Sequence, residues 1–355
     1  MIDPVTVRPP CPVMLARPGG SSVPVGDFSY EPKWDGFRCL AFVLPDRVVL
    51  QSRSEEDIAY AFPEVVAMVE QLPVGTVLDG ELAVVHAGAL DFGVLSTRLR
   101  PRSEVGGNIA VLAERHPAVL IGFDLLARPG EDLRGVGAWR RHLALSDLDL
   151  PPGIFRTPAT RDAEEARQWA DVVAGAGLDG IIAKPIDGTY EPGVRALIKV
   201  KPVHTADVVV AGWRPYKTPG ADGGPLVGSL LLAAYDDAGR LHHVGAASSF
   251  SRAARQEMTD LLRPLVADDA HPWHEPDPAM RVPDAPNRWR RSADKDLHLL
   301  PEGLVAEVRF DSMIAGRFRH VAKFLRWRPD RTPRSCTFDQ FPQPEPLPVT
   351  DVLAW

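Results

Sequence analysis

The stretch FSYEPKWDGFRCLAFVL (28–44) consists of two runs rich in aromatic and aliphatic residues, with Asp35-Gly36 between them. Such runs favour β-strands, and an Asp-Gly pair favours a turn. We therefore expect two extended segments joined by this turn. Side chains two positions apart in a strand point to the same face, so Lys33 and Asp35 would lie side by side. An amine beside a carboxylate at a strand end is, by itself, most simply a surface ion pair.

Outward from this stretch, residues 1–202 alternate between further strand patterns and helical patterns. The helical spacing of apolar residues is clearest near 162–174, where Asp162 can cap the helix and Gly175 follows it. A second helical pattern covers 61–72. This mixture predicts an α+β domain with largely antiparallel sheets. Further strands are expected in VVLQSRS (48–54), TVLDGELAVV (76–85), AVLIGFDLL (118–126), LDGIIAK (178–184) and ALIKVK (196–201).

The composition shifts near residue 202, which we take as a domain boundary. Residues 203–335 contain short β runs, a hairpin around Asp236–Gly239 and one amphipathic helix at 251–266. Several short strands and one helix suit a small barrel such as an OB-fold. The last segment, 336–355, is proline-rich and is expected to be an irregular tail.

The overall composition excludes several classes of protein. At 355 residues the chain is long enough for two domains, and 45% hydrophobic with 25% charged residues is normal for a soluble globular protein. It has no apolar run long enough to span a membrane and no N-terminal secretory signal. Its three widely spaced cysteines do not suit a four-cysteine zinc site or a disulfide framework. We therefore expect a cytoplasmic protein.

Charge is distributed unevenly along the chain. The net charge of −7 argues weakly against nucleic acid as a partner. From Arg281 to Arg334, however, there are thirteen Lys or Arg and only seven Asp or Glu. This basic region is either a solvated arginine-rich surface or a nucleic-acid contact, and charge alone leaves both readings open.

Lysine is scarce in this chain, because arginine supplies most of the positive charge. A lysine amine can lose its proton and attack, whereas the arginine guanidinium essentially cannot. Each lysine is therefore a candidate functional amine. The seven are Lys33, Lys184, Lys199, Lys201, Lys217, Lys295 and Lys323.

Four of these lysines fall in a recurring arrangement of carboxylates and amines at the ends of expected strands. Period-two alternation puts Asp79 and Glu81 on one face of their strand, and does the same for Lys199 and Lys201. Each pair alone is most simply a strand end that meets solvent. Together, convergent lysines suit a polyphosphate, and carboxylates suit the magnesium that accompanies it. The remaining members are Lys33, Arg53, Phe123, Asp124, Asp179 and Lys184.

In chain order, these segments resemble the motifs of the covalent nucleotidyltransferases, which include DNA ligases, RNA ligases and mRNA-capping enzymes. EPKWDGFR (31–38) resembles the K-x-D-G-x-R signature that carries the nucleophilic lysine. The match is best to bacterial two-domain ATP-dependent DNA ligases, of the ligase C type or the ligase module of ligase D. The segments similar to the later motifs are QSRS (51–54), LDGEL (78–82), FDLL (123–126), DGIIAK (179–184), IKVK (198–201) and FLRWRPDR (324–331).

Two positions depart from the family pattern. The fourth motif opens with Asp179 where glutamate is usual, and the last motif ends in Arg331 where lysine is usual. Both departures keep the charge, and neither removes the nucleophile. The resemblance implies a nucleotidyltransferase domain of ATP-grasp-like antiparallel sheets with helices (1–202), followed by an OB-fold β-barrel domain (203–335).

The resemblance also implies a reaction in three steps. Lys33 would attack the α-phosphate of ATP and expel pyrophosphate, AMP would pass to the 5′-phosphate of a nick, and the 3′-hydroxyl would then displace AMP. The catalytic residues would be Lys33, Asp35, Lys199 and Lys201, and Glu81 and Asp179 would hold Mg²⁺ or Mn²⁺. The nucleotide would be bound by Glu31, Lys33, Arg38, Arg53, Glu81, Phe123, Lys184, Lys199, Lys201, Arg326, Arg328, Asp330 and Arg331.

Individual roles follow from the same resemblance. Phe123 would stack on adenine, Glu31 lies in the segment that reads its edge, and Glu81 would accept a hydrogen bond from the ribose. The four residues of the last motif would orient pyrophosphate while the second domain is closed over the first.

A nicked DNA substrate makes Arg288, Arg290 and Arg291 candidate contacts to DNA phosphates and places the enzyme at the nucleoid. We expect a monomer that acts in DNA repair, with repair proteins as partners. One alternative is an RNA ligase or a GTP-using capping enzyme of the same superfamily. Another is a non-catalytic OB-fold DNA-binding module, which would not explain Lys33 and Glu81 together with Lys199.

Overall fold

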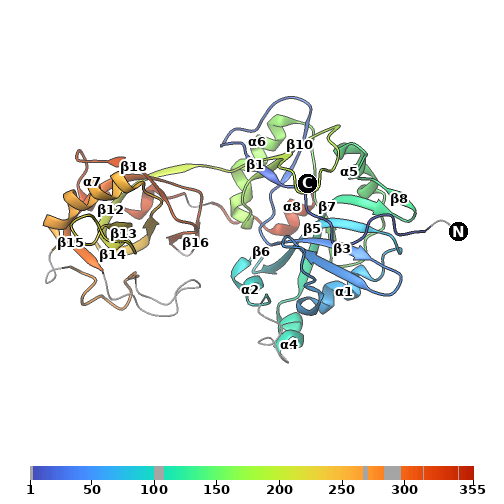
Figure 1. Cartoon of the computed structure of the whole chain (residues 1–355), viewed down its shortest axis with the longest axis horizontal. Coiled ribbons are helices and arrows are strands. Elements are labelled where there is room, and N and C mark those ends of the chain that lie inside the picture. Colours follow the sequence, from blue (N-terminus) through green and yellow to red (C-terminus); the bar gives the residue numbers. More distant parts are fainter. Residues whose placement is uncertain (1–2, 100–107, 267–270, 284–296, 315, 343) are drawn as a thin grey trace. The chain divides into compact units, whose positions relative to one another are not determined.

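The computed structural model describes residues 3–99, 108–266, 271–283, 297–314, 316–342 and 344–355. The chain forms two units, drawn in Figure 1. The first contains residues 1–202 together with 344–355, and the second contains residues 203–343. The chain therefore passes into the second unit and returns to the first at its C-terminal end. Within the ranges given above, no helix has the length and apolar character needed to cross a bilayer.

The first unit is built on a large sheet with the strand order β4-β3-β5-β7-β8, to which β6 and β9 are added. Its pairings are antiparallel except that of β7 with β9, which confirms the expectation of largely antiparallel sheets. Alternation in β3 sends Cys39 and Ala41 to one core and Leu40 and Phe42 to another, so both faces are covered. The strands are β3 (Phe37–Val43), β4 (Val48–Ser52), β5 (Val77–His86), β6 (Ala89–Leu90), β7 (Ala118–Arg128), β8 (Glu131–Asp132) and β9 (Ile154–Arg156).

Helices cover one face of this large sheet. Val65 and Val69 of α1 and Leu145 of α5 are buried in the same core as alternate residues of β3, β4 and β5. The helix α1 begins at Pro63, whose missing N–H suits the first helical turn, and it is shorter than the expected 61–72. The bounds are α1 (Pro63–Val69), α2 (Phe92–Ser96), α4 (Asn108–Arg115) and α5 (Ala138–Ser146).

A smaller sheet in the first unit has the order β1-β11-β10-β2. The pairing of β1 with β11 is parallel and the other two are antiparallel. The expected helix near 162–174 is α6, capped by the Asp162 side chain, which accepts from the Glu164 N–H. It runs into a 3₁₀ turn (Val173–Ala176) that ends at Gly177 with φ +79°, a conformation that glycine adopts readily. The bounds are β1 (Ala16–Pro18), β2 (Phe28–Pro32), α6 (Ala163–Val172), β10 (Ile181–Pro185) and β11 (Leu197–Val200).

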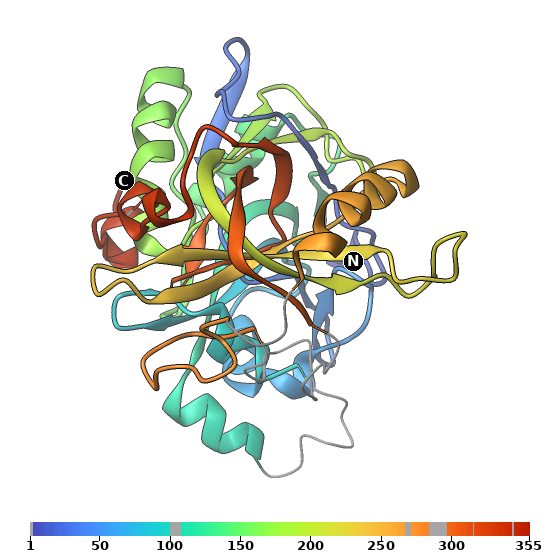
Figure 2. The same cartoon turned by 90° about the vertical axis from the view of Figure 1, so that its left-hand side faces the viewer.

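The C-terminal segment is not the irregular tail that its prolines suggested. It ends in α8 (Val349–Leu353), whose Val349 and Val352 are buried in the same core as Trp169 of α6. The Trp355 ring stacks on Trp169 at 5.0 Å, and Figure 2 shows α6 beside the C-terminal segment. The segment forms a helix in spite of its prolines, because its apolar residues lie at helical spacing and become buried against the first unit.

The second unit contains an antiparallel sheet of order β14-β13-β12-β15-β18 and a two-stranded pair, β16 with β17. The expected hairpin joins β13 and β14, and the expected helix at 251–266 is α7 with a 3₁₀ turn after it. Met258 and Leu262 of α7 pack in the core of this unit with Trp213. The bounds are β12 (His204–Pro215), β13 (Val227–Tyr235), β14 (Leu241–Ala247), α7 (Arg252–Leu262), β15 (His298–Phe310), β16 (Met313–Ile314), β17 (Arg317–Phe318) and β18 (Lys323–Trp327).

Candidate active site

Lys33 lies just after β2, in the connection to β3, rather than within a strand. Its backbone N–H donates to Gly180 O at 2.7 Å, and its carbonyl accepts from Asp179 N–H at 3.1 Å. The expectation that Lys33 and Asp35 share one face of a strand is therefore wrong, because the chain leaves the strand at Pro32. The partner segment of Lys33 lies almost 150 residues further along the chain.

The Lys33 side chain contacts that same segment. Its Nζ lies 2.8 Å from Asp179 Oδ2, and Lys201 Nζ lies 2.8 Å from the same oxygen. One carboxylate thus lies between two ammonium groups. A Cβ at Gly180 would lie 2.2 Å from Val200 O, so only glycine lets the turn at Asp179 approach the end of β11, next to Lys201, this closely.

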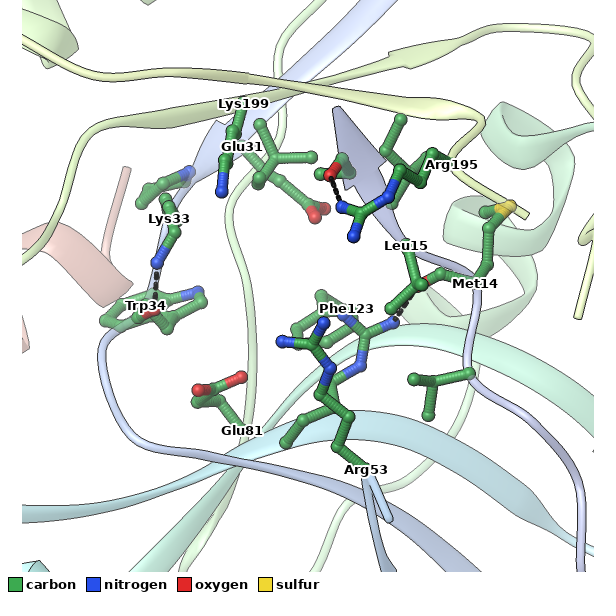
Figure 3. A pocket seen from close by; sticks show the side chains of 16 residues that line it. Met14, Leu15, Glu31, Lys33, Trp34, Arg53, Glu81, Phe123, Arg195 and Lys199 are labelled. Atoms are coloured by element: carbon green, nitrogen blue, oxygen red, sulfur yellow. Dashed lines mark hydrogen bonds between the residues drawn. The ribbon is translucent and has the colours of Figure 1, made fainter. Parts of the chain in front are cut away.

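A pocket in the first unit opens beside Lys33, and Figure 3 shows its lining side chains. Its walls come from both sheets: β1, β2, β10 and β11 of the smaller one, and β3, β5 and β7 of the larger one. Seven residues that we selected from the sequence line it together: Glu31, Lys33, Arg38, Arg53, Glu81, Phe123 and Lys199.

The large sheet contributes a pair of side chains through simple alternation. Leu78 and Leu82 of β5 face the apolar core, so Asp79 and Glu81 share the opposite face, as expected. Asp79 is fully buried and binds Arg38 through two hydrogen bonds, 2.5 Å to Nε and 2.6 Å to Nη2. The Arg38 guanidinium lies 4.4 Å from the centroid of the Phe123 ring, within cation–π range.

Lys184 does not line the pocket but supports two residues that do. Its Nζ donates to Phe123 O at 2.7 Å and lies 3.0 Å from Glu31 Oε2. Asp124, next to Phe123, is bound at both oxygens by the buried Arg141. These contacts fix the aromatic ring and the Glu31 carboxylate in place.

Burial and charge alter the acid–base behaviour of three pocket residues. Burial raises the pKa of Glu31 and of Glu81 to about 7, although Lys184 and Arg38 respectively oppose the shift. The pKa of Lys199 is lowered, first by burial and then by the positive charges of Lys201 and Lys33, with smaller effects from Arg195 and Arg53. Four positive charges, those of Lys201, Lys33, Arg195 and Arg53, therefore surround Lys199, and such a group suits an anion.

Other pocket residues were missed by the sequence argument. The segment Val13–Ala16 forms part of the wall, as do Trp34, Ile182 and Leu197. Arg195 also lines the pocket and donates to Ala16 O at 3.1 Å. Apolar wall residues cannot be told from core residues in a sequence. Arg195 is charged and lies four positions before Lys199, so it could have been selected as a candidate.

Glu81 and Asp179, the two carboxylates expected to hold a metal ion, each have other partners in the structure. Among the described residues, no three or more His, Cys, Asp or Glu side chains gather in a way that could hold a metal ion. Glu81 Oε1 accepts from Gly36 N–H at 3.1 Å, and Asp179 is paired with two lysines. The assignment of these two carboxylates to a metal stays a prediction.

The residues of the last motif lie in the second unit, at the end of β18. Arg328 binds Asp207 at 2.9 Å and Asp330 at 2.7 Å, and Arg331 lies 3.7 Å from Asp207. Arg326 binds Glu307 at 2.6 Å. The candidate DNA contacts Arg288, Arg290 and Arg291 lie outside the described residues.

Known protein families match both units. The model of the ATP dependent DNA ligase domain matches residues 18–201, and that of the ATP dependent DNA ligase C terminal region matches residues 223–331. DNA ligase C2 of Mycolicibacterium smegmatis is 46% identical over 349 residues, covering 95% of this chain and 96% of that protein. DNA ligase C of Mycobacterium tuberculosis is 41% identical over 359 residues, covering 98% of each.

Solved structures share the fold at lower identity. A Lig E DNA ligase is 16% identical with a TM-score of 0.51, and the match covers 89% of this chain and 99% of that one. At this identity the likeness concerns the fold alone.

Proposed function

This chain belongs to the ATP-dependent DNA ligase family, and from that premise we propose how its own residues divide the work of sealing a nick. The enzyme joins a 3′-hydroxyl to a 5′-phosphate at the expense of ATP. The observation that carries the residue assignments is the pocket beside Lys33, which gathers seven residues selected for nucleotide binding from five different strands and their connections.

In the first step, Lys33 Nζ attacks the α-phosphorus of ATP. A nitrogen–phosphorus bond forms, the bond from phosphorus to pyrophosphate breaks, and the proton that the amine gives up leaves on the pyrophosphate. Asp179 orients Nζ through the 2.8 Å contact. Lys199, which lines the pocket, and Lys201, which shares Asp179, offset the negative charge on the phosphate as it is attacked.

The remaining pocket residues bind the rest of the nucleotide. Phe123 stacks on adenine, Glu31 accepts from its edge, and Glu81 accepts from a ribose hydroxyl. Arg53 and Arg38 lie on the same wall, and Arg38 is already neutralised by Asp79. Arg38 therefore shapes the pocket more than it adds net charge, whereas Arg53 contributes its charge to the phosphate end.

Two further transfers complete the reaction. The 5′-phosphate of the nick attacks the lysyl-AMP phosphorus, which releases Lys33 and gives an adenylated DNA end. The 3′-hydroxyl then attacks the 5′-phosphorus, forms the phosphodiester bond and releases AMP. Only the first two steps use the amine of Lys33, which makes the last step separable by mutation.

Mg²⁺ fits this pocket as a companion of ATP, and Mn²⁺ has the same ligand preferences. Proteins hold Mg²⁺ through one or two carboxylates together with substrate phosphates, so a cluster of three carboxylates is not required. Glu81, on the pocket wall, and Asp179, beside Lys33, are the residues that would hold it. When bound, the ion neutralises phosphate charge.

We propose that the second unit is an OB-fold, supported by its five antiparallel strands and by the packing of α7 on their core. Its last-motif residues, Arg326, Arg328, Asp330 and Arg331, would bind the leaving pyrophosphate during the first step. They would then have to withdraw, since DNA needs the same face of the nucleotide pocket.

Lys33→Ala tests the proposal directly. We expect no AMP on the variant after incubation with labelled ATP, while single-turnover sealing of a nick that already carries a 5′-adenylate persists. Lys33→Arg should behave alike, because arginine stays protonated. An acid-labile AMP adduct on either variant would show that another residue is the nucleophile. Nicks with a DNA or an RNA 3′-hydroxyl strand, compared in the same assay, separate a DNA ligase from an RNA ligase.

A further inference from the structure

We infer that Tyr190 is a positioning residue of the nucleotide pocket, whose hydroxyl fixes the Asp79–Arg38 pair and the wall segment at Met14 without touching the substrate. The inference rests on the proposed function of the pocket. Tyr190 lies in the connection from β10 to β11, is 4% exposed and is not among the lining residues.

The first observation is the pair of contacts made by one hydroxyl. Tyr190 donates to Asp79 Oδ2 at 2.7 Å and accepts from Met14 N–H at 3.0 Å. Both contacts are buried. They join the N-terminal segment, the strand β5 and the β10–β11 connection, which are far apart in the sequence. A buried hydroxyl that is satisfied as donor and as acceptor has one orientation, so it can fix both partners.

The second observation is that Asp79 depends on several donors. A fully buried carboxylate is stable only when its oxygens are paired and hydrogen-bonded. Oδ1 binds Arg38 Nε, and Oδ2 is shared between Arg38 Nη2 and Tyr190. Loss of the Tyr190 hydroxyl leaves Oδ2 with fewer donors and leaves the Met14 N–H without its acceptor. Arg38 then has a less rigid partner.

The third observation links this network to the pocket itself. Arg38 Nη2 also donates to Met14 O at 3.3 Å, so Met14 is bound at its N–H by Tyr190 and at its carbonyl by Arg38. Arg38 lies over the Phe123 ring at 4.4 Å. Met14, Arg38 and Phe123 all line the pocket. The Tyr190 hydroxyl therefore sets the relative positions of three wall residues.

The network is separate from the reacting amine. Lys33 Nζ is paired with a different carboxylate, that of Asp179, at 2.8 Å. Burial and the Asp79 charge raise the pKa of Tyr190 above its usual range, so the hydroxyl remains a donor throughout the working pH range. Loss of the hydroxyl should therefore weaken binding of the base and ribose and leave the chemical step nearly unchanged.

Tyr190→Phe tests this inference, with Tyr30→Phe as the matched control. Tyr30 is 1% exposed, belongs to the same unit, and donates to Pro24 O at 2.6 Å, so its variant loses one part-buried hydrogen bond outside the network. Adenylylation from ATP is measured for KM and kcat, and urea unfolding for stability. We expect some loss of stability in both variants, and a larger one in Tyr190→Phe, because its hydroxyl makes two buried hydrogen bonds. Only Tyr190→Phe should raise KM for ATP, by about tenfold, with kcat within about twofold of wild type.

Other outcomes overturn the inference. An equal KM in the two variants, or a loss confined to kcat, would show that Tyr190 does not position the pocket. A Tyr190→Phe chain that fails to fold would make the residue purely structural. Failure of the proposed function looks different, because wild-type protein would then form no lysyl-AMP at all.

Discussion

Arg38 in the first unit and the arginines of the last motif in the second unit are all paired with carboxylates, but in very different surroundings. Asp79, the partner of Arg38, has no exposed side-chain surface and is held by Tyr190 as well. In the second unit, the Arg326 side chain is 64% exposed. Arg328 divides its bonds between Asp207, which is 12% exposed, and Asp330, which is 61% exposed.

This difference in burial indicates that the first unit holds a preformed site, whereas the last motif of the second unit makes contacts that can be exchanged. A buried carboxylate without its cation is costly, so the Arg38–Asp79 pair fixes the pocket before any substrate binds. Exposed ion pairs contribute little, so Arg326 can leave Glu307 for a phosphate at small cost. Arg328 is only 18% exposed and must leave Asp207, which is 12% exposed, as well as the exposed Asp330. This matches the proposed reaction, in which the pocket is needed at every step and the last motif only while pyrophosphate leaves.

The largest expected effect is on the buried pair. Asp79→Asn should lower the free energy of unfolding by about 3 kcal/mol and should abolish adenylylation, because the Arg38 charge loses its counter-ion inside the protein. Asp330→Asn is the control from the exposed set and should leave stability nearly unchanged. Urea unfolding of both variants gives the comparison. Equal losses would contradict the contrast between the two units.

Arg328→Ala should separate the steps of the reaction. We expect adenylylation from ATP to slow by about 100-fold, the usual loss when one transition-state donor is removed. Sealing of a pre-adenylated nick should stay within about threefold of wild type. Arg334→Ala is the control, because Arg334 lies nearby in the chain and contacts Gly239 O and the Tyr235 ring instead. Equal losses in both steps would mean that Arg328 serves folding or DNA binding.

Val352→Ala tests whether the C-terminal segment belongs to the first unit in function as well as in packing. Val352 is fully buried in the core that also contains Trp34, the neighbour of Lys33. We expect a loss of about 1–3 kcal/mol in unfolding free energy and slower adenylylation. Val321→Ala, at a side chain in the second unit that is 60% exposed, should change neither. A chain cut after Lys201 would lack α8, so it does not test the first unit fairly.

The smallest expected effect is on the pH dependence of ATP binding. Burial raises the pKa of Glu81 to about 7, so its carboxylate fraction rises between pH 6 and pH 8. A carboxylate accepts a hydroxyl bond more strongly than the neutral acid, so KM for ATP should fall as pH rises, by up to about tenfold. Glu81→Gln cannot titrate and should show a flatter profile. A profile as steep as that of wild type would assign the pH dependence to other groups, among them Glu31.

Much of the candidate site could be predicted because the patterns that identify it are short stretches of sequence. Alternation alone placed Asp79 and Glu81 on one face, and the scarcity of lysine singled out Lys33 and Lys199. The reaction class followed from the order of short motifs, and the comparisons with known proteins confirm it. Hydrophobic residues that recur every two or every 3.6 positions are a local property of the sequence, so the main strands and helices could be predicted as well.

Only the tertiary structure decided which of these residues meet. Asp179 is the partner of Lys33, where the sequence suggested Asp35, because the chain leaves β2 before the lysine and pairs with a distant glycine turn. No local sequence pattern predicts the contacts of Tyr190, the position of Met14 in the pocket wall or the packing of α8 on the first unit. Such contacts arise when sheets bring remote segments together and burial demands a partner for each polar group, a requirement that no local pattern encodes.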